Sequence, residues 1–227
     1  MSTDPIGVAA TVAGWLVDRT RESDRFAIAL AGGSTPRFLY EALATSAFRG
    51  DIDWGRWHVF FGDERAVGAD NPASNYRLAH DTLLVKVGVP DARVHRMEAE
   101  RPDLDAAGAE YSALLERERG APPRLDVVLL GLGTNGHTAS LFPGTPALDV
   151  VDAWATRGVA DYEPVDRITM TAPAINAAAH VAFLVTGGGK AEALRGVAAG
   201  TVPAALVRPR DGDLTWFLDE AAAASVR

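Results

Sequence analysis

The chain contains no cysteine among its 227 residues. This absence excludes disulfide bonds, thiolate nucleophiles and the cysteine ligands of structural zinc sites. A hydrophobic core can replace such staples, because a chain of this length buries roughly 70% of the surface that it exposes when unfolded. Hydrophobic residues make up 48% of the sequence. We therefore expect an ordinary globular protein held together by its core.

Positive charge is in deficit, and lysine is scarce. The formal net charge is −8, so the overall field repels nucleic acids and anionic lipids, and we expect neither as a partner. An anionic substrate would need a local group of positive charges. Only Lys86 and Lys190 among the 22 basic residues are lysines. A lysine at a special position is therefore informative in this chain.

The apolar stretch at residues 6–17 lacks the features of a signal peptide or a membrane span. No Lys or Arg precedes it, Gly14 interrupts it, and Asp18, Arg19 and Arg21 follow it at once. We predict an amphipathic first helix there. A cytoplasmic protein is the default expectation.

Short apolar runs alternate with helical patterns along the whole chain. Several runs are continuously apolar, as in parallel strands that are covered on both faces. Strand–helix alternation predicts an α/β layered sheet with right-handed crossovers. The predicted strands are Phe26–Ala31, His58–Phe61, Leu125–Gly131, Ile168–Thr171, Val181–Thr186, Ala204–Val207 and Leu214–Leu218.

Two stretches rich in Gly, Pro, Asn and Asp, Gly62–Ser74 and Leu141–Asp152, are predicted to be irregular. Each directly follows a strand or a glycine-rich turn, so neither is typical of a domain linker. In an open α/β sheet, loops after the carboxyl ends of strands bind ligands. We therefore predict one domain over residues 1–227 with two functional loops.

The segment from Gly32 to Pro36 follows the first predicted strand and opens a helix. Gly32 and Gly33 allow a tight turn and a close approach of the backbone to a ligand. Thr35 suits the N-cap and Pro36 the first helical position. A helix N-terminus offers N–H groups to an anion such as phosphate. A plain strand-to-helix turn favours the same residues, so this motif alone leaves both interpretations open.

Three charged residues in succession, Asp63-Glu64-Arg65, follow the second predicted strand. They cannot all lie in a core, so some of them face a solvent-filled site or pair with one another. A local ion pair at a surface turn explains Glu64 adequately. It explains Asp63 and Arg65 less well, because only Gly62 separates them from a buried strand.

One histidine, His137, stands on a glycine-rich turn after an apolar strand. Imidazole titrates nearest to neutral pH, which makes it the natural proton acceptor at such a place. The other four histidines, at strand starts, in a helix and in a polar loop, are better explained as structural or solvated. The spacing Gly131, Gly133, Gly136 also matches G-x-G-x-x-G. We reject a dinucleotide site, because the motif lies past mid-chain and no helix of normal length can follow it.

The glycine run Gly187–Gly189 places Lys190 at the start of a helix, where its charge opposes the helix dipole. A cation at that position is poorly explained as helix support and suits a phosphate ligand. The Walker A pattern is not satisfied. Arg167, just before a predicted strand, is a second candidate cation, although an arginine at a strand edge is commonly solvated.

These four segments, in this order, resemble the 6-phosphogluconolactonase family and, more loosely, the related glucosamine-6-phosphate deaminase/isomerases. The resemblance extends from about Ala29 to Arg195. Its most specific parts are Gly62–Arg65 with Ser74-Asn75, and Gly136–Gly144. It implies a single-domain, Rossmann-like α/β/α sandwich with a mainly parallel sheet. It also implies hydrolysis of 6-phospho-D-glucono-1,5-lactone to 6-phosphogluconate in the oxidative pentose phosphate pathway, without a cofactor.

The resemblance also implies roles for individual residues. His137 is similar to a water-activating base, and Asp63 to its charge partner or orienting group. The implied phosphate cradle is formed by Ser34, Arg167 and Lys190 with the backbone N–H groups of Gly32, Gly33 and Ser34. Arg65 resembles an arginine of the substrate site. Backbone N–H groups near the glycine-rich turn would stabilise the oxyanion.

One residue departs from the family pattern. The family usually carries Asp directly before the Gly-His pair, and this chain has Asn135. Asparagine forms hydrogen bonds but brings no charge that would raise the pKa of a histidine. A base role for His137 survives this change, whereas a role that needs a carboxylate at position 135 does not.

Two alternatives remain at this stage. In a glucosamine-6-phosphate deaminase/isomerase, a catalytic Glu follows the Gly-His pair. Here Ser140-Leu141-Phe142-Pro143 holds no carboxylate, and only Asp63 keeps this alternative open. A sugar-phosphate sensor would need a DNA-binding module, for which residues 1–25 are too short and too acidic. We expect no metal site, because no histidine pair has ligand spacing, and we favour a monomer whose partner is a small sugar phosphate.

Overall fold

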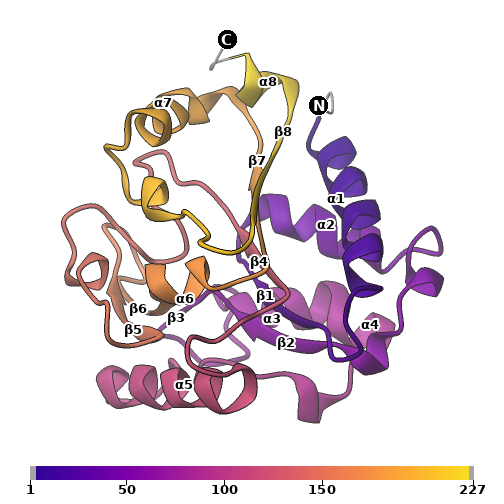
Figure 1. The fold of residues 1–227 in the computed structure, drawn as a ribbon, viewed down its shortest axis with the longest axis horizontal. Coiled ribbons are helices and arrows are strands. Elements are labelled where there is room, and N and C mark those ends of the chain that lie inside the picture. The colour runs from indigo at the N-terminus through magenta and orange to yellow at the C-terminus, as the bar shows by residue number, and fades with distance from the viewer. Residues whose placement is uncertain (1–3, 225–227) are drawn as a thin grey trace.

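A five-stranded parallel sheet forms the centre of the molecule (Figure 1). The structure is a computed structural model that describes residues 4–224. The strand order is β2-β1-β4-β7-β8, and every neighbouring pair is parallel. The strands of this sheet are β1 (Ala27–Leu30), β2 (His58–Phe61), β4 (Val127–Leu130), β7 (His180–Val185) and β8 (Asp213–Leu218).

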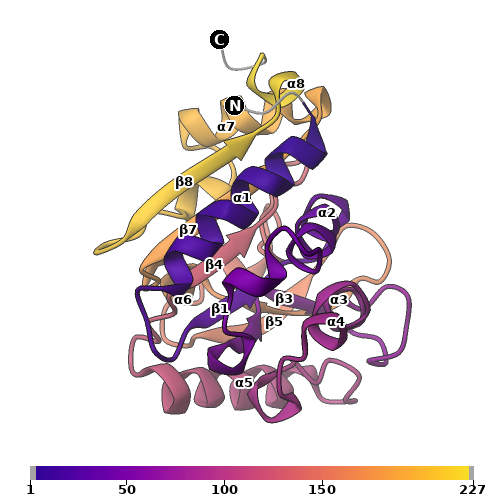
Figure 2. The ribbon, with the colours of Figure 1, turned by 90° about the vertical axis from the view of Figure 1, so that its right-hand side faces the viewer.

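Helices cover the sheet on both faces. They are α1 (Pro5–Thr20), α2 (Ser34–Leu43), α3 (Asn75–Ala79), α4 (Val85–Val87), α5 (Leu104–Arg119), α6 (Ala172–Asn176), α7 (Ala191–Ala199) and α8 (Glu220–Ala223). Figure 2 shows α1 and α2 lying across one face, and α5 lies on the other side in Figure 1. Because strand side chains alternate between faces, Ile28 packs in the core under α1 and α2, whereas Ala29 packs in the core with α5 to α8.

A second, smaller sheet lies against α5. Its three antiparallel strands, in the order β3-β6-β5, are β3 (Asp63–Arg65), β6 (Asp166–Met170) and β5 (Ala155–Val159). Only Gly62 separates β2 of the central sheet from β3 of the small one. The chain therefore passes from one sheet to the other at the point where Asp63 stands.

The predicted α/β sandwich with a mainly parallel sheet is confirmed, and so is the amphipathic first helix. Helix α1 buries the apolar face that includes Val8, Val12 and Leu16. The ends of the predicted domain, residues 1–3 and 225–227, lie outside the described residues. No helix among residues 4–224 is long and apolar enough to cross a membrane.

Some predicted elements are wrong. Ala204–Val207 forms no strand, because Pro203 opens a 3₁₀ turn there (Pro203–Leu206). Strands β3 and β5 lie at positions where no strand was predicted. The N-cap of α2 is Gly33 rather than Thr35, and the helix begins at Ser34, so Pro36 is not its first residue. Because β3 covers Asp63–Arg65, the stretch Gly62–Ser74, which was predicted to be irregular, is partly a strand.

Candidate active site

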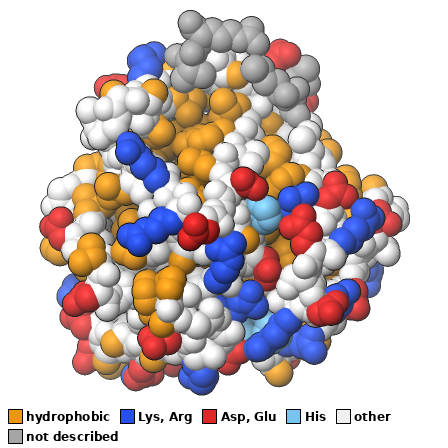
Figure 3. Space-filling model, in the orientation of Figure 1, with side chains coloured by type: hydrophobic (Ala, Val, Ile, Leu, Met, Phe, Trp, Pro, Cys, Tyr) orange, Lys and Arg blue, Asp and Glu red, His pale blue; other side chains and the backbone are white. Residues whose placement is uncertain are grey.

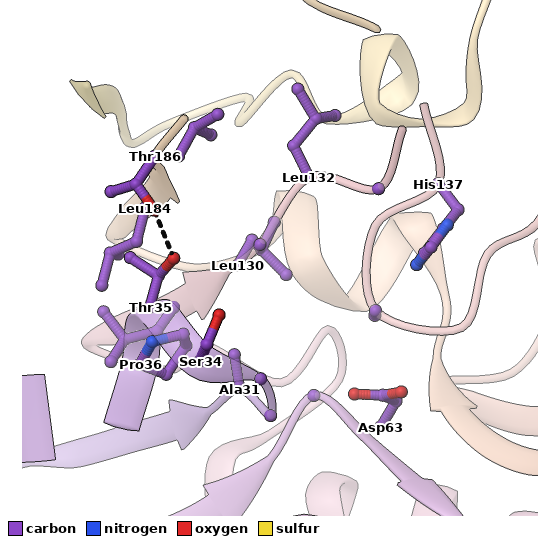
Figure 4. Close-up of a pocket in the computed structure, with 18 of the residues that line it drawn as sticks. Ala31, Ser34, Thr35, Pro36, Asp63, Leu130, Leu132, His137, Leu184 and Thr186 are labelled. Carbon is purple, nitrogen blue, oxygen red and sulfur yellow. Dashed lines mark hydrogen bonds between the residues drawn. The ribbon is translucent and has the colours of Figure 1, made fainter. Parts of the chain in front are cut away.

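A pocket opens at the carboxyl ends of β1, β2, β4 and β7, lined by the loops that follow these strands (Figure 4). From β1 the chain moves to β2 on one side of the sheet and later to β4 on the other. Such a switch point leaves a crevice in which open α/β sheets bind ligands. The pocket lies at this crevice. Of the two loops predicted to be functional, Gly62–Ser74 contributes to the lining, whereas no residue of Leu141–Asp152 lines the pocket.

The two ends of the pocket differ in character. Figure 4 shows His137 and the carboxylate of Asp63 on one side, and Thr35 and Thr186 on the other, with Ser34 pointing into the space between. On the molecular face in Figure 3, basic side chains lie among acidic ones and form no broad basic surface. Positive charge that an anionic substrate needs is therefore a local property of the pocket.

The N-terminus of α2 forms one wall of the pocket. Gly33 has a φ of 104°, a conformation that other residues rarely adopt. A side chain at Gly32 would overlap the amide of Asn75. The hydroxyls of Thr35 and Thr186 lie 2.8 Å apart and join this turn to the loop after β7. The free N–H groups of the first helical turn and its dipole favour an anion here.

The glycine-rich turn after β4 positions His137. Its backbone closes on itself, since the N–H of Gly133 donates to the carbonyl of His137 at 2.8 Å. The imidazole is half-buried and stacks on Phe142 with ring centroids 4.0 Å apart. Its Nδ1 lies 2.6 Å from Oδ1 of Asn135. The stack on Phe142 thus fixes the plane of the ring, and the contact with Asn135 fixes its Nδ1 edge.

The surroundings of His137 favour a neutral imidazole. Burial lowers its pKa below the usual value, and the charges of Lys190 and Arg167 act in the same direction. The carboxylates of Asp63 and Asp161 oppose this shift. A neutral ring at pH 7 is able to accept a proton, as a general base must.

Asp63 is held in place by neutral partners. Ser140 Oγ donates to its Oδ2 at 2.6 Å, and Asn75 Nδ2 donates to its Oδ1 at 3.0 Å. The side chain that bonds the His137 ring is Asn135 and not Asp63. The expected role of Asp63 as charge partner of His137 stays a prediction, and Asn135 is the side chain placed to orient the ring.

The neighbours of Asp63 in β3 have different tasks. Glu64 is 3% exposed and accepts hydrogen bonds from the N–H groups of Asn75 and Tyr76 at the start of α3. The expected surface ion pair is therefore wrong, and Glu64 is a buried cap whose pKa is raised by burial. Arg65 lines the pocket and donates from Nη1 to the carbonyl of Ala73 at 2.6 Å.

The two candidate cations are placed differently. Lys190 lies at the helix start as predicted, lines the pocket and donates from Nζ to the carbonyl of Leu132 at 2.7 Å. Burial lowers the pKa of its ammonium group. Arg167 is only 1% exposed and lies behind the pocket wall, with its guanidinium 5.2 Å from the ring centre of Tyr162. It is a buried strand residue and not the solvated edge arginine that its position also allowed.

Arg167 still offers unused hydrogen-bond donors. Its Nε and Nη2 are buried without a hydrogen-bond partner among the described residues, and so is Nε of Arg65 on the neighbouring strand. Buried donors of this kind are costly unless something accepts from them. A phosphate reaching this wall would provide acceptors, so the expected role of Arg167 in the phosphate cradle stays a prediction.

The oxyanion expectation needs adjustment. Three N–H groups of the glycine-rich turn are already used, since Gly133 donates to the His137 carbonyl, Gly136 to the Gly133 carbonyl, and His137 to Oδ1 of Asn135. These three donors are engaged in shaping the turn. Stabilisation of an oxyanion would fall to other N–H groups near this turn, and the expected role stays a prediction.

Two features of the site escaped the sequence. Tyr162, on the connection between β5 and β6, lines the pocket and packs on Phe142 with ring centroids 5.7 Å apart. Next to it, Asp161 accepts a hydrogen bond from Asn135 at 2.9 Å. Neither residue lies in a motif, and only the meeting of two sheets brings them close to His137.

A family model described as "Glucosamine-6-phosphate isomerases/6-phosphogluconolactonase" matches residues 6–216. The chain belongs to this family. The 6-phosphogluconolactonase of Synechocystis sp. is 44% identical over 209 residues, which cover 88% of this chain and 84% of that protein. That of Nostoc sp. is 43% identical and covers 91% and 87% of the two chains. The predicted membership in an enzyme family is therefore confirmed.

Solved structures agree with this assignment. A 6-phosphogluconolactonase from Trypanosoma brucei is 28% identical, with a TM-score of 0.87 and coverage of 100% of this chain and 97% of that one. A monomeric glucosamine-6-phosphate deaminase is 21% identical, with a TM-score of 0.86 and coverage of 99% and 100%. The second likeness shows a shared fold only.

One group among residues 4–224 has the spacing of a metal site, at the amino end of β2 and far from the pocket in the fold. The ligand atoms of His58, His95 and Glu118 lie within 4.8 Å of one another, which sequence spacing could not reveal. Arg25 already donates to His58 at 3.1 Å and to Glu118 at 2.6 Å. Burial, with the charges of Arg25 and Arg93, lowers the pKa of His58 to about 4. The positive charge of Arg25 within this group makes it unfavourable for a second cation.

Gly133→Ala should disable the site while leaving the fold intact. A Cβ at position 133 would overlap Nδ1 of His137, so the imidazole must leave Asn135 and its stack on Phe142. We expect the rate of lactone hydrolysis, the activity expected from the sequence, to fall about tenfold or more, since misplacement of a catalytic group by about 1 Å can cost that much. Steady-state kinetics with circular dichroism as a folding check would measure it. The control is Gly14→Ala, where a Cβ meets nothing within 4 Å. Equal activity of both variants would contradict the prediction.

Proposed function

We propose that this protein hydrolyses 6-phospho-D-glucono-1,5-lactone to 6-phosphogluconate, the lactonase step of the oxidative pentose phosphate pathway, with His137 as the general base. The observation that carries the proposal is a pocket with two unlike ends. A half-buried, neutral imidazole lies at one end and the N-terminus of α2 at the other, and Lys190 is part of the lining. Its curated relatives of 44% and 43% identity carry the name of this activity.

The phosphate end holds the substrate in place. The first turn of α2, Ser34 and Lys190 would bind the phosphate, with Arg65 and Arg167 as further donors from the wall formed by β3 and β6. The phosphate takes no part in bond breaking. Its binding contributes by holding C1 of the lactone beside the base, which replaces an encounter in solution by a fixed geometry.

The reaction itself needs one proton acceptor. His137 removes a proton from water, the oxygen of that water forms a bond to C1, and a tetrahedral oxyanion results. When the oxyanion collapses, the bond from C1 to the ring oxygen breaks. The imidazolium returns its proton to that ring oxygen, which becomes a hydroxyl group. Asp63 lies close enough to stabilise the transient positive charge on the imidazolium through its field.

The experiment that tests the proposal couples the product to a 6-phosphogluconate dehydrogenase and follows NADPH formation, with correction for spontaneous lactone hydrolysis. Enzyme-dependent acceleration is expected. No acceleration over the spontaneous rate would contradict the proposal. Ammonia release from glucosamine 6-phosphate should be measured in parallel, because Asp63 is the one carboxylate in the pocket lining that a deaminase could use.

Chelators should not reduce the activity. The proposed mechanism activates water with an imidazole and needs no Lewis acid. We expect the rate after dialysis against EDTA to match the untreated rate. The buffer alone serves as the control. Loss of activity that a divalent ion restores would contradict a metal-free mechanism, and a His95→Ala variant would then show whether the group around His58 is responsible.

A further inference from the structure

Asn135 stands between the proposed base and a carboxylate. Its Oδ1 lies 2.6 Å from Nδ1 of His137, and its Nδ2 donates to Oδ2 of Asp161 at 2.9 Å. We propose that Asp161 is a positioning residue: its carboxylate orients the Asn135 amide, which keeps a proton on Nδ1 of His137 and leaves Nε2 free to accept the proton of water. This inference rests on the proposed function, because it takes His137 as the base.

The reasoning starts from the ambiguity of an amide. An asparagine can turn either its oxygen or its NH₂ group toward a neighbour. If the NH₂ group faced His137, Nδ1 would have to accept, the ring proton would move to Nε2, and the base would be blocked. An ionised carboxylate only accepts hydrogen bonds, so Asp161 draws the NH₂ group to itself. The oxygen of Asn135 is then left facing the ring.

A second contact supports the same orientation. The backbone N–H of His137 donates to Oδ1 of Asn135 at 3.1 Å, and a backbone N–H can only donate. The turn thus holds the oxygen of the amide on this side, and Asp161 presents an acceptor to the NH₂ group on the other side. The arrangement is consistent with one tautomer of His137, protonated at Nδ1.

Asp161 comes from a separate part of the fold. It lies on the connection between β5 and β6 of the small sheet, whereas Asn135 and His137 follow β4 of the central sheet. Beside it, Tyr162 packs on Phe142, which in turn stacks on His137. The connection therefore touches the catalytic turn at two points, one polar and one aromatic.

The carboxylate also acts through its charge. Asp161 and Asp63 raise the pKa of His137 against burial, while Lys190 and Arg167 lower it. Loss of Asp161 should therefore lower the pKa of the base further. The acid limb of the activity profile would then move to lower pH. Because Asp161 is exposed, solvent screens its charge and the shift should be modest.

Asp161→Ala tests the proposal against Glu163→Ala, which removes an exposed carboxylate two residues along the same connection. We expect kcat for the lactone to fall about three- to tenfold in Asp161→Ala, with KM nearly unchanged, as for one lost hydrogen bond. Glu163→Ala should match the wild type. Equal kcat values and equal pH profiles for the two variants would overturn the proposal.

A rescue variant separates positioning from simple damage. In the Asp161→Ala background, Asn135→Asp places an acceptor-only group directly on Nδ1 of His137, so the need for Asp161 disappears. The double variant should recover most of the lost kcat. In the wild-type background, Asn135→Asp would set two carboxylates side by side, so it should perform worse than the double variant. A higher kcat for the single Asn135→Asp variant than for the double variant would contradict the proposed role of Asp161.

The tautomer can be measured without any turnover. Long-range ¹H–¹⁵N NMR spectra of uniformly labelled protein distinguish Nδ1–H from Nε2–H imidazole. We expect His137 to be the Nδ1–H tautomer in the wild type and in Glu163→Ala, and a mixture in Asp161→Ala. An unchanged tautomer of His137 in Asp161→Ala would overturn the proposed positioning role of Asp161 even if the enzyme is active. If instead His137→Ala keeps full activity, the base role of His137 in the proposed function has failed, and the spectra of the wild type still decide the hydrogen bonding.

Discussion

Replacement of His137 by alanine is expected to lower kcat for lactone hydrolysis by about 10²- to 10⁴-fold, the usual contribution of a positioned general base. No other residue along the described pocket lining is a histidine, and the His137 ring combines a pKa lowered by burial with a fixed orientation. The variant should fold, because the imidazole is half-buried on a loop and lies outside both core clusters. The coupled assay and circular dichroism measure these two expectations.

The pH profile adds a second readout to this prediction. Burial lowers the pKa of His137, so the neutral, active form persists below the usual imidazole pKa of about 6.5. For the wild type, kcat/KM should therefore be level at neutral pH and fall only as the pH drops below that value. The residual rate of the alanine variant should lack this acid limb.

His80→Ala is the matched control for the histidine substitution. His80 is partly exposed, lies beside Asp81 and is not one of the residues that line the pocket. Its removal should leave both kcat and the pH profile unchanged. A folded His137→Ala protein with kcat close to that of the wild type would contradict the role of His137 as general base, whatever the control shows.

Replacement of Lys190 by alanine is expected to raise KM by roughly ten- to a hundred-fold, because a charge-assisted contact is worth about 1.5–3 kcal/mol. The ammonium group lies at the start of a helix, where it opposes the dipole and where an anion would relieve that conflict. The phosphate stays bound throughout the reaction. Loss of one of its contacts therefore weakens all states alike and changes kcat little.

The same variant should lose its preference for the phosphorylated lactone over unphosphorylated gluconolactone. Inorganic phosphate should also become a weaker competitive inhibitor. Lys86→Ala is the control, since Lys86 is the other lysine of the chain and is exposed on α4. An unchanged substrate preference would move the phosphate site elsewhere. A fall in kcat alone would show that Lys190 acts by holding the Leu132 carbonyl rather than by binding phosphate.

The sequence predicts strands well where burial on both faces leaves a continuous apolar run. Such runs locate β1, β2, β4 and β7 of the central sheet, and β2 matches the predicted His58–Phe61 at both ends. The predicted Leu214–Leu218 also overlaps the fifth strand, β8, although this edge strand is only partly buried. The run at 204–207 misleads, because Pro203 has no N–H for a sheet and fits the first position of a helical turn. Strands β3 and β5 give no such run, since they are short, partly charged and held by pairing with β6.

The site shows the same division between local and distant information. His137, Asp63 and Lys190 stand in local motifs, and the structure brings them to one pocket. Tyr162 and Asp161 have no motif, because their role depends on a contact between loops of two different sheets. His58 and His95 likewise come together only through packing, with ring centroids 5.6 Å apart, and their spacing in the sequence does not predict this contact.

The order of strands also bears on how the molecule folds. In the central sheet, β1 lies between β2 and β4, and Ile28 on β1 pairs with Val127 on β4, so this pairing closes a long loop that holds the chain from α2 through α5. Pairings between distant segments form slowly. The pocket lies across the paired ends of β1 and β4, and residues of β7 line it as well. Recovery of activity after denaturation should therefore be among the last events of refolding, which makes turnover a stricter measure of a correctly refolded molecule than its helix content.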